Sequence, residues 1–345
     1  MSKLDDRSRE ILWAIIESYI ASNGPVGSRA VTKKYSLGLS PATIRNTMAD
    51  LEEMGYVTQP HTSAGRIPTE KGYRLYVNSI LKQYSRTVND LLLKQLYYRM
   101  RSIEKDMSNL LKETSKTLSA FSHYLGIATS PKAEEITLKS IKFLKYDKHR
   151  VFSVLISEEG IVKDKIIFLK ESFSQKLLDK AANFLNSELA GLTLREAKLK
   201  ILALISEEEL TCNNLIHNAL ALCRQAIALE TEDMLYAGEI SGASNLPDFA
   251  NMKQIKELFK AIEEKHLMVT LLDKMIDSEG VQVFIGSENS YSEMNELTMV
   301  GSTYNDGSRV LGTLGIIGPT RMNYEKIIPI VDLTAKTLTR ILSKK

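Results

Sequence analysis

The order of helix starts and stops in the first 70 residues constrains this chain more than any other feature. Asn23-Gly24-Pro25 interrupts a helical pattern, and a tight turn at residues 36–39 precedes Ser40 and Pro41. Serine favours the cap position of a helix, and proline favours its first turn, where a missing N–H loses no partner. The sequence therefore predicts helices over residues 5–22, 28–35 and 41–55, the second capped by Ser28 and the third by Ser40.

The third predicted helix has a face suited to the major groove of DNA. At 100° per residue its apolar side chains share the inner side: Ile44, Met48 and Leu51. The outer side and its flanks hold small or polar residues: Ala42, Thr43, Arg45 and Asn46. Asparagine pairs well with adenine, and arginine pairs with guanine or a phosphate. Helix, turn and helix in this order predict a helix-turn-helix DNA-binding module.

A short hairpin is predicted directly after this helix. Residues 56–59 and the stretch from Ile67 have strand patterns, and Pro60 and Pro68 bracket the loop between them. Such a wing would place Arg66 at its tip, in the minor groove or on a phosphate. A solvated hairpin on a small helical domain is the alternative. The predicted DNA contacts are Ser28, Arg29, Ser40, Ala42, Thr43, Arg45, Asn46, His61, Thr62, Ser63, Gly65 and Arg66.

Charge alone is a weak guide to a partner. The 345 residues carry 45 Lys or Arg and 42 Asp or Glu, for a net charge of +3. Residues 1–150 hold 24 basic and 15 acidic residues, whereas residues 151–345 hold 21 and 27. Most of the basic excess lies in residues 86–150, and residues 1–85 carry only +3. The charge distribution permits DNA binding, but the motifs carry the inference.

Several classes of protein are disfavoured by the composition. No apolar run approaches the ~20 residues of a membrane-spanning helix, and the acidic amino terminus is unlike a signal peptide, so we expect a cytoplasmic protein. The chain has two cysteines, and their spacing does not match that of metal ligands. The sequence therefore predicts neither a disulfide framework nor a metal site. Gly312, Gly315 and Gly318 lie in an apolar run and predict a buried strand rather than a phosphate loop. We expect no catalytic residues and no cofactor.

The remainder of the chain predicts an α+β body. A helical stretch over residues 87–125 has apolar spacings of three and four, which suit either a coiled-coil seam between subunits or a helix packed on its own sheet. Strand and helix patterns follow at residues 141–146, 151–156, 161–169, 177–189, 281–286, 311–317 and 324–342. Strands at both ends, with mainly helical sequence between, predict one sheet interrupted by an insertion over residues 191–265.

Two long motifs resemble a known family. Residues 40–55 read SPATIRNTMADLEEMG, and residues 59–69 read QPHTSAGRIPT. Near the other end, Ser302-Thr303-Tyr304 precedes LGTLGIIGPTRMNY at residues 311–324. Both closely resemble the bacterial heat-inducible transcription repressor family HrcA, and the likeness spans the chain. Pro41 stands where a second small polar residue would be expected, which removes one backbone donor and one possible phosphate contact.

This resemblance implies a multidomain α+β protein. It implies a winged helix-turn-helix domain at residues 1–85, a GAF-like domain at 86–190 and 266–345, and a helical dimerising insertion at 191–265. It also implies a homodimeric repressor of chaperone operons that binds an inverted repeat in double-stranded DNA, is released by heat, and is assisted by the GroE chaperonin. The alternative is a regulator that senses a small molecule in a cavity of the GAF-like domain.

Overall fold

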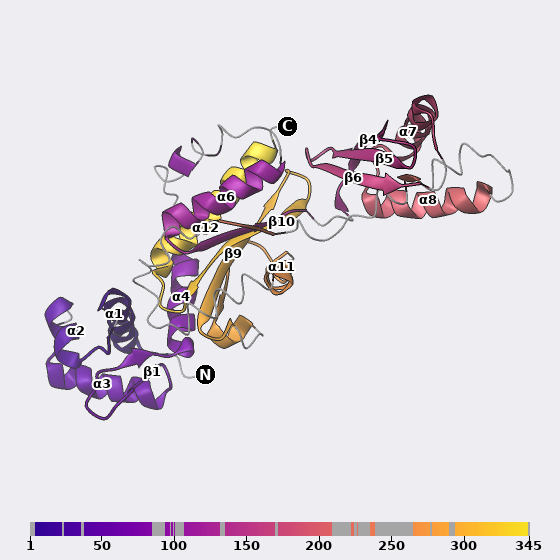
Figure 1. Cartoon of the computed structure of the whole chain (residues 1–345). Coiled ribbons are helices and arrows are strands. Elements are labelled where there is room, and N and C mark those ends of the chain that lie inside the picture. The colour runs from indigo at the N-terminus through magenta and orange to yellow at the C-terminus, as the bar shows by residue number, and fades with distance from the viewer. Residues whose placement is uncertain are drawn as a thin grey trace.

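Three bodies make up the chain, with the amino-terminal helices at one end, a five-stranded sheet in the centre and a three-stranded sheet at the other end (Figure 1). The computed structural model describes residues 4–22, 24–35, 38–84, 94–96, 98, 100, 107–131, 135–169, 172–208, 222–223, 226, 235–238, 265–276, 278–289 and 294–343. Among these residues, no helix combines the length and apolar character needed to cross a membrane.

The amino-terminal body is a winged helix. It contains α1 (Asp6–Ser22), α2 (Ser28–Lys34), α3 (Pro41–Glu53), β1 (Val57–Thr58) and β2 (Ile67–Pro68). Ile11, Ile15, Ile44 and Leu51 are fully buried between the helices. The Ser40 cap is confirmed, because its Oγ accepts a hydrogen bond from the Thr43 amide at 3.2 Å. The Ser28 cap is wrong: Gly27 holds the cap position of α2, and no side chain there accepts a capping hydrogen bond.

Helix α4 (Glu70–Tyr84) follows the wing and leads toward the central body. Thr69 caps this helix, because its Oγ1 accepts a hydrogen bond from the Gly72 amide at 3.2 Å. The same hydroxyl donates to the Gly55 carbonyl at 2.7 Å, which ties α4 to the end of α3.

The central body is one antiparallel sheet with helices against both faces. Its strands lie in the order β7 (Leu235–Ala237), β3 (Leu125–Thr129), β10 (Val310–Pro319), β9 (Leu297–Asn305) and β8 (Gln282–Ile285). Helices α6 (Met107–Ser122) and α12 (Tyr324–Leu342) lie together against one face, and α11 (Lys265–Asp273) lies against the other (Figure 1). Gly312, Gly315 and Gly318 all lie in the buried strand β10, as expected.

For residues 87–125 the sequence suited either a coiled-coil seam between subunits or a helix packed on its own sheet, and α6 favours the second alternative. Leu110, Leu111 and Leu118 are buried where α6 packs on β3, so this part of the helical stretch covers its own sheet. The helix ends at Ser122, and Leu125 begins a strand, although the sequence pattern extended the helix to Leu125. His123 adopts a positive φ of 66°, which stops the helix before β3. Residues 85–93 and 101–106 lie outside the described part of this stretch.

The expectation of a single sheet is wrong. Strands β4 (Leu138–Lys145), β5 (Arg150–Ser157) and β6 (Val162–Phe168) pair into a sheet of their own, beside α7 (Gln175–Leu189) and α8 (Leu194–Glu208). The chain leaves the central sheet after β3 and rejoins it at β7, and β7 falls inside the range 191–265 that was expected to be inserted. Hydrophobic alternation predicts a strand but not its sheet, because pairing depends on distant residues. The described part of the three-stranded sheet, with α7 and α8, therefore lies between β3 and β7 in the chain.

Candidate nucleic-acid interface

The first two turns of α3 present the side chains expected to contact DNA. Ala42, Arg45 and Asn46 are exposed and Thr43 is half-buried, while Ile44 and Thr47 face inward. The Ser40 hydroxyl, 2.9 Å from the Thr43 hydroxyl, already caps the helix, so it contributes to the geometry of this surface. Asp50 and Glu53 are exposed farther along α3. The positive end of the helix dipole and Arg45 therefore make the amino-terminal half of α3 the part suited to phosphate and base edges.

Helix α2 adds cationic side chains beside this surface. Arg29, Lys33 and Lys34 are exposed, whereas Ser28 is half-buried. The Ser28 carbonyl accepts a hydrogen bond from the Thr32 hydroxyl at 2.9 Å, which belongs to the helix itself. Of the two expected residues of α2, Arg29 is the one with a charged side chain free to reach a phosphate.

The wing loop presents three of the expected side chains. His61, Thr62 and Ser63 are all exposed at its end. The side-chain amide of Gln59 holds the loop from inside, because its Nε2 donates to the carbonyls of Thr62 and Ala64, each at 2.9 Å. The loop backbone is therefore held in place while its polar side chains remain available.

Arg66 does not lie at the tip of the wing, and this corrects its expected position. Its amide and carbonyl exchange two hydrogen bonds with Val26, each 2.9 Å long, so Arg66 joins the base of the wing to the segment before α2. Its guanidinium lies 2.7 Å from a carboxylate oxygen of Glu52, and the side chain is only 18% exposed. Gly65 packs directly on the Val26 backbone, where a Cβ atom would overlap it. Both residues shape the wing from its base.

Glu52 and Gln59 are further functional candidates, which no local sequence pattern indicates. One carboxylate oxygen of Glu52 accepts from the Gln59 amide at 3.0 Å, and the other forms an ion pair with the Arg66 guanidinium. Gln59 directly follows β1 and Arg66 directly precedes β2, so this carboxylate links α3 to both sides of the wing. Nothing in the local pattern separates Glu52 from its neighbour Glu53, which is exposed. Only the tertiary fold brings the carboxylate of Glu52 to the wing.

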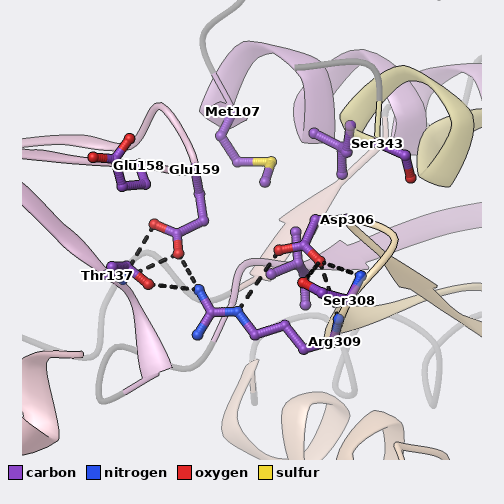
Figure 2. A pocket seen from close by; sticks show the side chains of 10 residues that line it. Met107, Thr137, Glu158, Glu159, Asp306, Ser308, Arg309 and Ser343 are labelled. Carbon is purple, nitrogen blue, oxygen red and sulfur yellow. Dashed lines mark hydrogen bonds and ion pairs between the residues drawn. The ribbon is translucent and has the colours of Figure 1, made fainter. Parts of the chain in front are cut away.

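A second polar site lies where the three-stranded sheet meets the central body. A cavity of about 390 Å³ is lined there by ten residues, among them Glu158, Glu159, Asp306 and Arg309 (Figure 2). Arg309 donates to the Glu135 carbonyl at 2.6 Å, to the Thr137 hydroxyl at 2.8 Å and to the Glu159 carboxylate. Glu159 is almost fully buried and also accepts from the Thr137 amide at 3.0 Å.

The charges at this junction compensate one another. Burial raises the pKa of Asp306, but hydrogen bonds from Ser308 and the nearby Arg309 outweigh it and leave the pKa below its ordinary value. Asp306 is therefore ionised at neutral pH, beside the guanidinium of Arg309. The arrangement can join two bodies through paired charges. Among the described residues, no group of three or more His, Cys, Asp or Glu side chains could hold a metal ion.

Comparisons with known proteins agree with the winged helix and with the body that follows. Residues 3–81 match the model of the winged helix-turn-helix transcription repressor, HrcA DNA-binding domain, and residues 108–328 match that of the HrcA protein C-terminal domain. A heat-inducible transcription repressor HrcA from Geobacter sulfurreducens is 42% identical over 99% of both chains. Another from Thermodesulfovibrio yellowstonii is 36% identical over 99% of this chain and 98% of its own.

A solved structure has the same fold. A crystal structure described as that of a hypothetical protein covers 99% of both chains with a TM-score of 0.66 and 23% identity. The two family models together cover most of the chain, and the model of the DNA-binding domain names a transcription repressor. This chain, with its winged helix-turn-helix DNA-binding domain, therefore belongs to the HrcA family of heat-inducible transcription repressors.

Proposed function

We propose that this repressor binds an inverted-repeat DNA operator of chaperone genes as a homodimer, with one winged helix on each half-site. The observation that carries the proposal is the exposed amino-terminal half of α3 beside a braced wing. Arg45 and Asn46 read bases, while Ala42 allows close approach and Thr43 contacts a phosphate or a thymine methyl. Residues that contact the backbone or hold the others in place complete the proposed interface: Ser28, Arg29, Ser40, His61, Thr62, Ser63, Gly65 and Arg66.

The dimer is supported by an apolar surface on the three-stranded sheet. Leu144 is 52% exposed, Ile166 is 40% exposed and Phe168 is 71% exposed. Directly paired residues of an antiparallel sheet share a face, and Phe152 pairs with both Leu144 and Ile166. Exposed apolar side chains gathered on one sheet face are typical of a protein interface. We define Leu144, Phe152, Val162, Ile166 and Phe168 as the outer sheet face and propose that two copies pair through it.

Heat control is proposed to act through folding of the body. When unfolded client proteins occupy the GroE chaperonin, less repressor would receive assistance, and the chaperone genes would be released. The resemblance to the family motivates this partner. Adding purified GroE and ATP to the repressor should raise the fraction that binds operator. An unchanged fraction would contradict chaperonin assistance without affecting the DNA-binding proposal. Since its operator lies in the bacterial cytoplasm, the protein is proposed to act there.

Binding to two duplexes across a range of salt concentrations tests the central proposal. An inverted repeat selected by the wild-type protein from a random pool is compared with a duplex of scrambled sequence. The repeat should bind at least about 10³-fold more tightly, and both affinities should fall as salt rises, because phosphate contacts release counterions. Equal affinity for the two duplexes would overturn the proposal of a specific repressor.

A small-molecule sensor is the second candidate, and the cavity beside Arg309 is the observation that favours it. A metabolite in that cavity would raise thermal stability and change operator affinity together, because both report the same bound state. A metabolite library screened by thermal shift, with operator binding measured for each hit, tests this candidate. Hits that raise stability without changing operator affinity would argue against a sensor.

A further inference from the structure

Helix α4 belongs to two bodies at once. It packs against α1 of the winged helix, where the Trp13 and Tyr76 rings meet edge to face with centroids 5.3 Å apart. It also packs against α12 and β8 of the central body. The Tyr73 ring lies 6.0 Å from the Tyr324 ring of α12. The orientation of the DNA-binding surface relative to the body therefore depends on how α4 is held.

Arg74 makes several polar contacts across this boundary. Its Nε donates to the Glu288 carboxylate at 2.8 Å, and a second guanidinium nitrogen donates to the other carboxylate oxygen. The same arginine donates to the Val283 carbonyl of β8 at 2.6 Å. Glu288 is itself held, because it accepts from the Ile285 amide at 2.8 Å. A two-point arginine–carboxylate contact restricts orientation as well as distance.

Glu70 adds a second contact one turn earlier on α4. Its carboxylate accepts hydrogen bonds from the Ser287 amide, at 3.0 Å, and from the Ser287 hydroxyl. This approach depends on Gly286, which has a φ of +51° and carries no Cβ to meet the Glu70 carboxylate. We name Glu70, Arg74, Ser287 and Glu288 the α4 clasp.

The other end of α4 is also held. The Tyr84 hydroxyl donates to the Asp332 carboxylate of α12 at 3.0 Å. Glu70 and Tyr84 lie fourteen residues apart, which corresponds to roughly 21 Å along an α-helix. Because α4 is contacted at both ends, it cannot reorient freely relative to the central body. The winged helix is therefore held in one orientation on the central body.

We propose that the α4 clasp determines which spacing between operator half-sites the dimer accepts. This inference rests on the proposed dimer and inverted repeat. Half-sites read by a symmetric dimer must lie whole turns of DNA apart, because both recognition helices must enter the major groove on one face. A winged helix held rigidly tolerates one spacing. A winged helix released from the clasp reorients and tolerates several, although each recognition surface is unchanged.

The test measures affinity for the selected inverted repeat with its spacer altered by 0, 2, 5 and 10 base pairs, and for a duplex with a single half-site. For the wild type, five added base pairs should weaken binding at least about tenfold, because the half-sites then lie on opposite faces of the duplex. For Arg74→Ala and Glu70→Ala, five added base pairs should weaken binding by no more than about threefold. The affinity of each variant for the single half-site should stay within about twofold of the wild-type value.

Two further variants separate positioning from loss of folding. Exchanging the charges, Arg74→Glu with Glu288→Arg, should restore part of the spacing selectivity. Arg9→Ala removes an ion pair to Asp6 within α1 that involves no residue of the clasp, and should leave the selectivity unchanged. Circular dichroism confirms that each variant is folded.

The experiment distinguishes a failure of the clasp proposal from a failure of the proposed function. Folded clasp variants that keep the wild-type spacing profile would overturn the role of the clasp and leave the proposed function standing. If the clasp variants also lost affinity for the single half-site, the role of the clasp in spacing would be overturned, because the clasp would then act on the DNA-contacting surface itself. If the wild type binds the repeat no better than a scrambled duplex, the proposed function fails and this inference fails with it.

Discussion

The guanidinium of Arg66 and the carboxylate of Glu52 lie 2.7 Å apart, joining the residue that precedes the second wing strand to the end of α3. The other carboxylate oxygen of Glu52 accepts from the Gln59 amide at 3.0 Å, so one side chain links α3 to the residues that flank both wing strands. Among the described residues, Arg66 Nε is a buried nitrogen without a hydrogen-bond partner. The guanidinium is thus mostly shielded from solvent, whereas the Glu52 side chain is 34% exposed.

Replacing Arg66 should therefore destabilise the winged helix. Arg66→Ala removes an ion pair, leaves the Glu52 carboxylate without its charged partner, and should cost about 1–3 kcal/mol of unfolding free energy, measured by urea denaturation. The slope of operator affinity against salt should stay close to that of the wild type, because the guanidinium faces Glu52. Arg29→Ala is the matched control and should lower the salt slope while sparing stability. A flattened slope with unchanged stability for Arg66→Ala would show that its guanidinium contacts DNA.

The exposed residues of α3 should behave in the opposite way. Arg45→Ala and Asn46→Ala should each cost about 1–3 kcal/mol of discrimination between the selected operator and single-base variants. Neither should change the unfolding free energy much, because both side chains are exposed. Operator titrations with each base changed in turn provide the measurement. Glu53→Gln, at the far end of α3, is the control and should leave the base preference intact.

Charge on the outer sheet face should separate the proposed dimer. Ile166→Asp places a carboxylate among Leu144, Phe152 and Val162, where burial in an interface would be costly. Sedimentation equilibrium should show a shift from dimer to monomer, and affinity for the two-half-site operator should fall with it. Leu199→Asp, at an exposed apolar position of α8, is the control. A dimer that survives Ile166→Asp would place the subunit interface elsewhere.

Breaking the Arg309–Glu159 pair should loosen the junction between the two sheets. Arg309→Ala removes the charged partner of the buried Glu159 carboxylate, which still accepts from the Thr137 amide, and should cost about 1–3 kcal/mol of unfolding free energy. Hydrogen exchange should rise in β4 and β5 more than in α3. Arg150→Ala, which removes an exposed pair to Asp147 within one hairpin, should have little effect. Equal protection of β4 and β5 in both variants would contradict the role of this pair.

High pH should weaken the contact between α4 and α12. Burial raises the pKa of Tyr76 and of Tyr84 above the ordinary value, and the nearby carboxylates of Glu325 and Asp332 raise both further. The unfolded phenols ionise near pH 10 while the folded ones remain neutral. The stability associated with these groups is therefore present below about pH 10 and is lost as the pH rises above it.

Phenylalanine variants isolate this effect from that of other tyrosines. Tyr76→Phe and Tyr84→Phe together should reduce the loss of unfolding free energy between pH 9 and 11, measured by urea denaturation. Tyr146→Phe is the control, because Tyr146 is exposed. An alkaline loss of the same size in the double variant and the wild type would exclude these two phenols as its source.

Local patterns predicted the elements that are stabilised by nearby residues. The Ser40 cap, the short hairpin after α3 and the turn between β4 and β5 all lie where the sequence places them. The last helix, α12, spans Tyr324–Leu342, the predicted range. Caps, turns and apolar periodicity involve residues within a few positions of one another, so the signal is present in the sequence itself.

Contacts between distant residues were not predictable in the same way. Glu52 and Glu53 are adjacent and chemically identical, yet only Glu52 reaches the wing. The sequence placed Arg66 at the tip of a loop, whereas backbone pairing with Val26, forty residues earlier, holds it at the base. The pattern of β4 to β6 predicted strands but could not show that these strands form a separate sheet.

The sequence by itself determined the recognition helix, the wing that follows it and the family motifs, because each is a short string whose residue types suit one local geometry. The tertiary structure alone decided the partner of Arg66, the sheet that β4 to β6 join and the contact of Arg74 with Glu288, 214 residues later in the chain. Such pairings depend on how remote segments pack after the helices and strands have formed, and no local pattern of side chains specifies that packing.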